Sequence, residues 1–209
     1  MEIAMRRGRR ADPQKDEAIL EAATALFLER GYGASIDDIA AAAGVSKQTI
    51  YARYACKHDL LAAIVHRTAE DLVSMLGDEA AKGSAEETLV KFAERFVDIV
   101  FDARRVAMQR LVIAQSARFP DLARLYHQSG PLFVQQRLAA FLAREAAAGR
   151  LAIDDAREAT SQLLGLILGA DHMASLMGLL DPEDEKQRRT RVRGAVQSFV
   201  RLCDAGSRD

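Results

Sequence analysis

The chain contains 209 residues, of which 49% are hydrophobic and 28% are charged, and its formal net charge is −1. This composition excludes a disordered chain, and such a length holds one domain or two modest ones with a sizeable core. The near-zero net charge argues against a protein that coats nucleic acid indiscriminately. Only four prolines and no tryptophan are present, while alanine and leucine are abundant, so we predict an all-α fold.

The N-terminal segment, residues 1–11, contains four arginines without a periodic apolar pattern. We expect a disordered basic arm that either follows DNA into a minor groove or only keeps the chain in solution. No apolar stretch accompanies these arginines, so a secretory signal is excluded and a cytoplasmic protein is expected. Asp12 and Pro13 then provide a cap and a first helical residue, and the first helix should run to about Arg30.

Two short helices joined by a tight turn are predicted next. Ser35 can accept the backbone N–H groups of the first helical turn, and Asp38 stands where its carboxylate completes a capping box. Gly44 ends this helix, because glycine adopts a left-handed backbone at the least cost. Ser46 caps the second helix, in which Ile50 faces inward. The pattern is typical of a helix-turn-helix, whose second helix enters the major groove of DNA.

The outward residues of the second helix fit contact with DNA. Those in its first turn should reach base edges, whereas the two tyrosines and the lysine after it should hold phosphates. The alternative is an ordinary helical hairpin with a solvated basic face and two core tyrosines. The predicted DNA-binding residues are Ser35, Ser46, Lys47, Gln48, Thr49, Tyr51, Tyr54 and Lys57.

Helical periodicity and helix-stop residues continue through the rest of the chain, and no alternating pattern of useful length predicts a strand. We expect about nine to ten helices in all. Asp154 is the predicted cap of the penultimate helix, which should reach about Leu180 before Asp181 and Pro182 break it. The helices expected after the module cover about 57–82, 84–100, 104–117, 120–129, 131–148, 154–180 and 183–204.

The last two of these helices carry features of a dimer interface. Small residues recur four positions apart on the first, where they would let another backbone approach closely, and the second offers an apolar stripe. Two such helices from each of two chains would form a four-helix interface in a homodimer. The alternative is that they only close the core of the monomer. The predicted interface residues are Ser161, Gly165, Gly169, Ala174, Val192, Val196 and Phe199.

The stretch GVSKQTIYARYACKHDLL resembles the N-terminal signature of the tetracycline-repressor (TetR) family of bacterial transcription regulators. The likeness covers roughly residues 13–65 and is specific in combination rather than residue by residue. Two positions are unusual for the family, Tyr54 where phenylalanine is commoner and His58 where an acid is common. The matching positions are Gly44, Val45, Ser46, Tyr51, Tyr54 and Lys57.

The resemblance implies a DNA-binding domain at 12–58, an effector-binding and dimerisation domain at 59–209, and double-stranded operator DNA as partner. The segment RLVIAQSARFPDLARLYHQSGP resembles a subgroup often associated with efflux-pump control, which implies a lipophilic or drug-like effector that releases a repressor. Apolar walls with a few directional polar groups are usual in such pockets. The residues expected there are Phe92, Phe96, Met108, Gln115, Phe119, Tyr126, His127, Phe133 and His172.

Other functional classes find little support. No Glu-x-x-His pair, phosphate-binding glycine loop or nucleophile elbow occurs, so no enzymatic activity and no cofactor are expected. Cys56 and Cys203 lack metal-site spacing, and no metal site is expected. The longest weakly charged run, 159–180, contains Asp171 and His172, which favours a buried helix over a membrane span. The alternatives are a helical interaction module without sequence-specific DNA binding and, after it, a helical-bundle enzyme.

Overall fold

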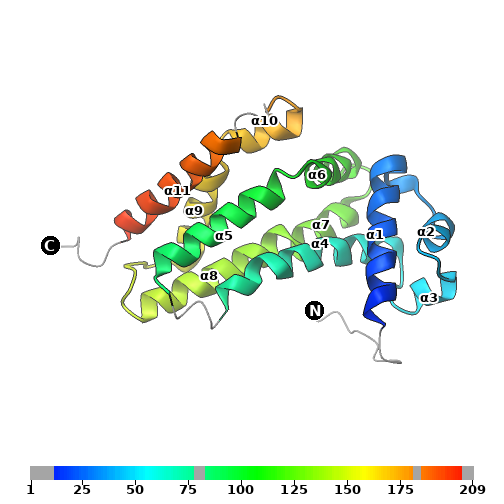
Figure 1. The fold of residues 1–209 in the computed structure, drawn as a ribbon, viewed down its shortest axis with the longest axis horizontal. Coiled ribbons are helices and arrows are strands. Elements are labelled where there is room, and N and C mark those ends of the chain that lie inside the picture. The colour runs from blue at the N-terminus through cyan, green and yellow to red at the C-terminus, as the bar shows by residue number, and fades with distance from the viewer. Residues whose placement is uncertain (1–11, 78–82, 181–184, 204–209) are drawn as a thin grey trace.

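The computed structural model describes residues 12–77, 83–180 and 185–203, and within them the chain is helical without strands, which confirms the predicted all-α class. The basic arm predicted at 1–11 and the helix break predicted at Asp181 and Pro182 lie outside the described residues. Figure 1 shows long helices running along the length of the molecule, with the first three helices gathered at one end.

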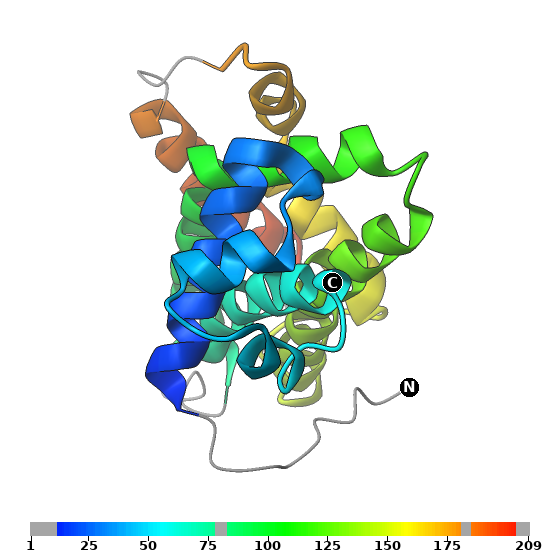
Figure 2. The same cartoon turned by 90° about the vertical axis from the view of Figure 1, so that its right-hand side faces the viewer.

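That end is a small helical module. The first helix begins where Asp12 accepts a hydrogen bond from the backbone N–H of Gln14 at 3.2 Å, with Pro13 as its first residue. Figure 2, which looks onto this end, shows the module lying across the longer helices behind it. Its elements are α1 (Pro13–Arg30), a 3-10 turn η1 (Gly31–Gly33), α2 (Ile36–Ala42) and α3 (Lys47–Tyr51).

The long helices carry the middle of the molecule. The helix predicted at 57–82 leaves α-helical geometry after Val73 and continues as a 3-10 turn, and residues 78–82 lie outside the described residues. The elements are α4 (Lys57–Val73), η2 (Ser74–Leu76), α5 (Ala85–Val100), α6 (Ala103–Gln115), α7 (Pro120–Ser129) and α8 (Pro131–Ala147).

The helix predicted from Asp154 to Leu180 is instead two helices, α9 (Ala156–Leu168) and α10 (Asp171–Met177). Asp155, not Asp154, is its N-cap and accepts the backbone N–H of Arg157 at 2.8 Å. Gly169 ends α9 with a φ of +54°, which is a glycine conformation.

The guanidinium of Arg191 fixes this break. It donates to the carbonyl of Ile167 at 2.9 Å and to the carboxylate of Asp171 at 2.9 Å. It therefore satisfies a free carbonyl at the end of α9 and pairs with the first residue of α10. Arg191 belongs to α11 (Glu185–Leu202), the last described helix.

Two apolar clusters form the core. One joins α4, α5, α8, α9 and α11, with Leu89, Phe92 and Leu138 among its fully buried side chains. The other joins α1, α2, α3 and α4 to α6 and α7, through residues such as Met108 and Leu122. The N-terminal module thus shares its core with helices beyond residue 58, and the predicted boundary at 58 is not a packing boundary.

Candidate nucleic-acid interface and ligand pocket

The start of α2 has the predicted capping box. The backbone N–H of Asp38 donates to the Ser35 hydroxyl at 3.1 Å, and the Asp38 carboxylate accepts the backbone N–H of Ser35 at 3.3 Å. The Ser35 hydroxyl also donates to the Asp38 carboxylate at 2.7 Å, and this bond, together with the one from the Ser35 backbone N–H, lowers the pKa of the Asp38 carboxyl and favours the carboxylate form that caps the helix. Ser35 therefore fixes where α2 begins.

The turn between α2 and α3 depends on Gly44. Its φ is +64°, a left-handed conformation, and the backbone N–H of Val45 then donates to the Ala40 carbonyl at 3.0 Å. Ile50 of α3 is fully buried against the module. The angle between the two helices is therefore set by a glycine turn at one end and by a buried side chain at the other.

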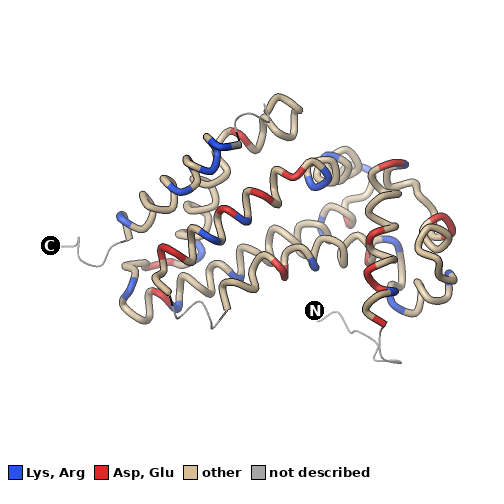
Figure 3. The backbone as a smooth tube through the Cα atoms, in the orientation of Figure 1, with Lys and Arg blue, Asp and Glu red and all other residues tan. Residues whose placement is uncertain are grey.

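The outer face of α3 is accessible. Lys47 and Gln48 are exposed, and 52% of Tyr51 is exposed to solvent. The Ser46 hydroxyl accepts the backbone N–H of Thr49 at 3.1 Å and lies 2.9 Å from its hydroxyl, so these two residues hold the start of the helix. Figure 3 shows that this end carries both signs of charge. Lys47 forms an ion pair with Asp37, and both side chains are more than half exposed, so the pair is weak enough to exchange for DNA.

Tyr54 and Lys57, which were predicted to bind phosphates, instead form hydrogen bonds within the protein. Tyr54 is 9% exposed, and its hydroxyl donates to the Asp16 carboxylate at 2.8 Å. The Lys57 ammonium donates to the carbonyls of Tyr32 and Ala34 at 2.5 and 3.1 Å and lies 4.4 Å from the centre of the Tyr32 ring. Burial lowers the pKa of Lys57. Both side chains are engaged inside the protein: Tyr54 joins the segment after α3 to α1, and Lys57 joins the start of α4 to η1 and Ala34.

Replacing Tyr54 by phenylalanine tests this structural role. We expect Tyr54→Phe to lower the free energy of unfolding by about 1 kcal/mol, because it removes a hydrogen bond to a partly exposed carboxylate. Urea unfolding measures the change, and the exposed Tyr51→Phe is the matched control. Unchanged stability together with weakened DNA binding would restore the predicted phosphate role of Tyr54.

The predicted effector residues do not line one cavity. Phe92 and Phe96 stack on each other with ring centroids 5.7 Å apart inside the first core cluster. Phe133 lies beside that cluster, with its ring 4.7 Å from His66. These side chains therefore pack in or against the core of the described residues. Met108, Phe119 and Tyr126 belong to the other cluster, Gln115 is half-buried and His127 is exposed.

His172 has partners within the fold. Its Nε2 is 2.9 Å from the side-chain oxygen of Gln109, and its ring meets the edge of Phe101 at 6.2 Å between centroids. Burial lowers its pKa, which favours the neutral ring. His172 therefore connects α10 to α6 rather than facing the other predicted effector residues.

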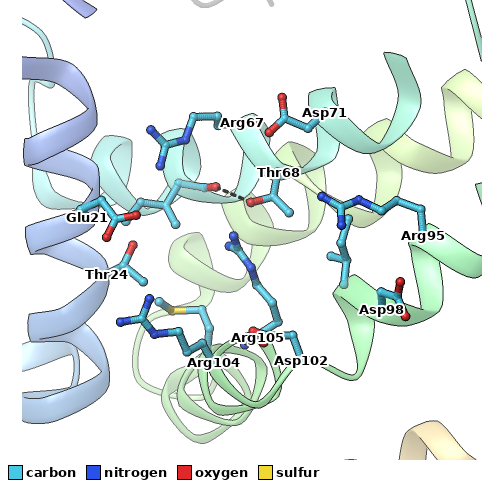
Figure 4. Close-up of a pocket in the computed structure, with 13 residues that line it drawn as sticks. Glu21, Thr24, Arg67, Thr68, Asp71, Arg95, Asp98, Asp102, Arg104 and Arg105 are labelled. Carbon is cyan, nitrogen blue, oxygen red and sulfur yellow. Dashed lines mark hydrogen bonds between the residues drawn. The ribbon is translucent and has the colours of Figure 1, made fainter. Parts of the chain in front are cut away.

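A different cavity, of about 370 Å³, lies between α1, α4, α5 and α6. Figure 4 shows its charged lining, with arginine side chains from α4, α5 and α6. Met108 is the one predicted effector residue that reaches it. Sequence reasoning missed this cavity because its residues come from four helices. Its charged and polar lining comprises Glu21, Thr24, Arg67, Thr68, Asp71, Arg95, Asp98, Asp102, Arg104 and Arg105.

The predicted dimer residues divide into two groups. Val192 and Val196 are fully buried and Phe199 is 2% exposed, so this stripe packs in the monomer core, as the alternative interpretation expected for α11. Ser161 and Gly165 are exposed on α9, and a Cβ added at Gly165 would meet nothing within 4 Å. Gly169 and Ala174 lie at and beyond the end of α9, so the predicted ridge stops there.

The described residues contain no cluster of histidine, cysteine or acidic side chains that could hold a metal ion. None of the described helices is both long and apolar enough to cross a membrane.

Two family models match the chain. Residues 19–64 match the bacterial regulatory proteins of the tetR family, and residues 87–203 match the C-terminal domain of AefR-like transcriptional repressors. The second match alone covers more than half of the chain. The chain therefore belongs to the TetR family and has an AefR-like C-terminal domain, which confirms the resemblance found in the sequence.

Solved structures agree over nearly the full length. A putative TetR-family regulator from Mesorhizobium loti has a TM-score of 0.76 at 25% identity and covers 92% of this chain and 98% of its own. The flavonoid-responsive regulator FrrA has a TM-score of 0.72 at 34% identity and covers 94% of this chain and 100% of its own. These relatives have the same fold from the N-terminal module to the last helices.

Curated relatives match over shorter stretches. A transcriptional repressor of Mycobacterium tuberculosis is 31% identical over 117 residues, which are 56% of this chain and 59% of the relative. The transcriptional activator FasR of Mycolicibacterium smegmatis is 39% identical over 71 residues, which are 33% of this chain and 32% of the relative. The chain thus spans less than two thirds of the length of each of these relatives.

Proposed function

We propose that this protein is a sequence-specific DNA-binding transcriptional regulator that acts as a homodimer and responds to a small molecule. The observation that carries the proposal is that α3 presents Lys47, Gln48 and Tyr51 to solvent. The capping box at Ser35 and the turn at Gly44 position α2 and α3 relative to each other. A helix presented in this way can enter the major groove, and both the family and the solved relatives are regulators. A DNA-binding role would place the protein in the cytoplasm of a bacterium.

The proposed division of labour on DNA follows from exposure. Lys47 and Gln48 have free access to base edges from the first turn of α3, with Thr49 positioned behind them by Ser46. Tyr51 has a half-exposed ring and is the proposed phosphate contact. The internal hydrogen bonds of Tyr54 and Lys57 support positioning roles for these two residues instead.

The outer faces of α9 and α11 are the proposed dimer interface. Gly165 of α9 and Gly194 of α11 have open space where a Cβ would lie, so a partner helix can approach both backbones closely. Leu166 and Leu202 are 46% and 81% exposed and would supply apolar area to the same contact. The proposed interface lies on the same two segments of the chain as the interface predicted from the sequence. On α11, however, it lies on the side opposite to the buried Val196.

Small-molecule control is supported by the shared core. Residues of α6 and α7 pack in the same apolar cluster as α1 and α3. A ligand that shifts α6 and α7 would therefore also shift the N-terminal module that carries α3. The relative FrrA is described as flavonoid-responsive. Repression is the proposed output, because the C-terminal family model describes repressors.

Fluorescence anisotropy with a duplex from the DNA flanking its own gene tests the DNA-binding role. We expect saturable binding that is weaker for a scrambled duplex of equal length and that falls as salt rises. A helical interaction module without DNA specificity would bind both duplexes equally or neither of them. Thr49→Ala should weaken binding to the gene's own duplex, whereas Lys91→Ala, at an exposed position on α5 outside the module, should not.

A further inference from the structure

The cavity of about 370 Å³ lies where the DNA-binding module meets the rest of the protein. Thr24 contributes to its lining from α1, Arg67 from α4 and Arg105 from α6. Figure 4 shows Arg105 crossing the cavity toward Thr68, with Arg67 above it and Arg104 below, on the side of α1. A ligand bound there would contact the module and the helices behind it at once.

The cavity is lined by four arginines, none of which has a side-chain partner among the described residues, and three of them lie close to α1 and α6. The side chains of Arg67, Arg104 and Arg105 form neither an ion pair nor a hydrogen bond with any residue in the described ranges 12–77, 83–180 and 185–203. Arg67 and Arg105 are also half-buried, which removes part of their hydration. Partial burial without a pairing carboxylate leaves the Arg67 and Arg105 guanidinium groups with donors that a bound anion could use.

The carboxylates around the cavity form no ion pair with these arginines among the described residues. Asp98 pairs with Arg189 of α11 at 2.9 Å, and Asp102 accepts the backbone N–H of Arg105 at 3.1 Å as the cap of α6. Glu21 and Asp71 are exposed at the rim, where water screens them.

The charge state of Arg105 reflects its surroundings. Burial lowers the pKa of its guanidinium, and the positive charges of Arg67 and Arg104 act in the same direction, against Asp102 and the Tyr126 hydroxyl. Arginine nevertheless stays protonated in proteins. Arg67 and Arg104 therefore repel the half-buried Arg105, and a bound anion would relieve that repulsion.

We propose that this cavity binds a small organic carboxylate, whose charged group lies between Arg67 and Arg105 and whose apolar part packs against Ile64 and Met108. Guanidinium groups bind carboxylates through paired, charge-assisted hydrogen bonds, and Ile64 and Met108, two of the three apolar side chains in the lining, suit a hydrocarbon ring. Binding also changes the affinity for operator DNA, a consequence that rests on the function proposed above.

The coupling follows from the position of the site. An anion that draws the arginines of α4 and α6 together would change the packing of α1 against α4 and α6. Because α1, α2 and α3 share one apolar cluster, α2 and α3 would move with α1. By linkage, the factor by which the carboxylate changes operator affinity equals the factor by which operator changes carboxylate affinity.

Calorimetric titration of the DNA-free protein with benzoate tests the site, with benzamide as a neutral molecule of the same shape. We expect benzoate to bind, benzamide to bind at least about tenfold more weakly, and Arg105→Gln and Arg67→Gln each to weaken benzoate by about tenfold or more. Lys91→Gln is the matched control, because it removes one positive charge from an exposed position on α5 outside the cavity and should leave benzoate binding unchanged.

Circular dichroism melting establishes that the variants are folded, and using two arginine variants keeps the test valid if one of them is not. Absence of benzoate binding, or equal affinity for the parent and a folded arginine variant, overturns the site. Operator titrations with and without benzoate then test the coupling, and equal operator affinities overturn it. Failure to bind any operator would contradict the proposed function instead, and the titration of the DNA-free protein is independent of that result.

Discussion

Replacing Gly165 by arginine should convert the dimer into monomers and lower operator affinity by about a hundredfold or more. Gly165 lies in the middle of α9 on an exposed face, with open space around the position of a Cβ. The monomer can therefore accept the substitution, whereas a partner helix in close contact cannot. Loss of the dimer removes the second DNA-binding module. Linked binding of two modules to two half-sites contributes roughly 10²- to 10⁴-fold in affinity.

Sedimentation velocity and operator titration measure the two effects in the same samples. Gly165→Ala is the matched control: it adds one methyl group, should keep the dimer, and should favour the helix by up to about 1 kcal/mol per chain. Gly169, the other glycine predicted at the interface, suits this test less well, because its φ of +54° would strain any other residue. An intact dimer for Gly165→Arg would place the interface elsewhere.

Replacing Gln48 by alanine should change which operator sequences are preferred. A bidentate contact between an amide side chain and a base discriminates by about 1–3 kcal/mol, and a symmetric dimer makes the contact once in each half-site. We therefore expect the preferred operator to lose about 2 kcal/mol or more, while binding to unrelated DNA stays nearly the same. Gln48 is exposed and its side chain forms no hydrogen bond with the described residues, so the fold should be unaffected.

Competition assays with operators altered one base pair at a time identify the position that Gln48 reads. Tyr51→Phe is the contrasting variant, because removal of a phosphate contact should weaken all DNA alike. If Gln48→Ala kept the parent's order of preference among these operators, the first turn of α3 would not be the base-reading element.

The helix-turn-helix could be predicted from the sequence because its signals are local. The capping box of Ser35 and Asp38 and the turn at Gly44 lie within a few residues of the structure they determine. These features depend on short-range hydrogen bonding and backbone preference, which sequence spacing reveals directly. The solvent-exposed first turn of α3 followed from the same pattern.

The roles of Tyr54 and Lys57 depended on contacts that sequence spacing does not reveal. Asp16, the partner of Tyr54, is 38 positions away in the chain, and the carbonyl of Tyr32 is 25 positions from Lys57. Both residues lie between the end of α3 and the start of α4, where a phosphate contact and an internal contact have the same spacing in the sequence. Only the positions of α1 and η1 in the fold distinguish these alternatives.

The C-terminal corrections have similar causes. A stripe such as Val192, Val196 and Phe199 shows that one face of α11 is buried, but not whether the monomer or a partner covers it. Gly169 was interpreted as a small residue in a helix, although a glycine also favours a helix end. The charged cavity could not be predicted from the sequence, because arginines on separate helices have the pattern of ordinary surface residues. Only the fold places Arg67 and Arg105 in the same cavity.

Selection of duplexes from a randomised library by the full-length protein, followed by sequencing, tests the central claim most directly. A dimer that places α3 in two major grooves should enrich an inverted repeat, with half-sites one helical turn of DNA or a multiple of it apart. The same repeat should be lost with Gly165→Arg and altered at one position in each half with Gln48→Ala. Enrichment of no motif, or of an asymmetric motif that Gln48→Ala leaves unchanged, would contradict a dimeric regulator that reads DNA through α3.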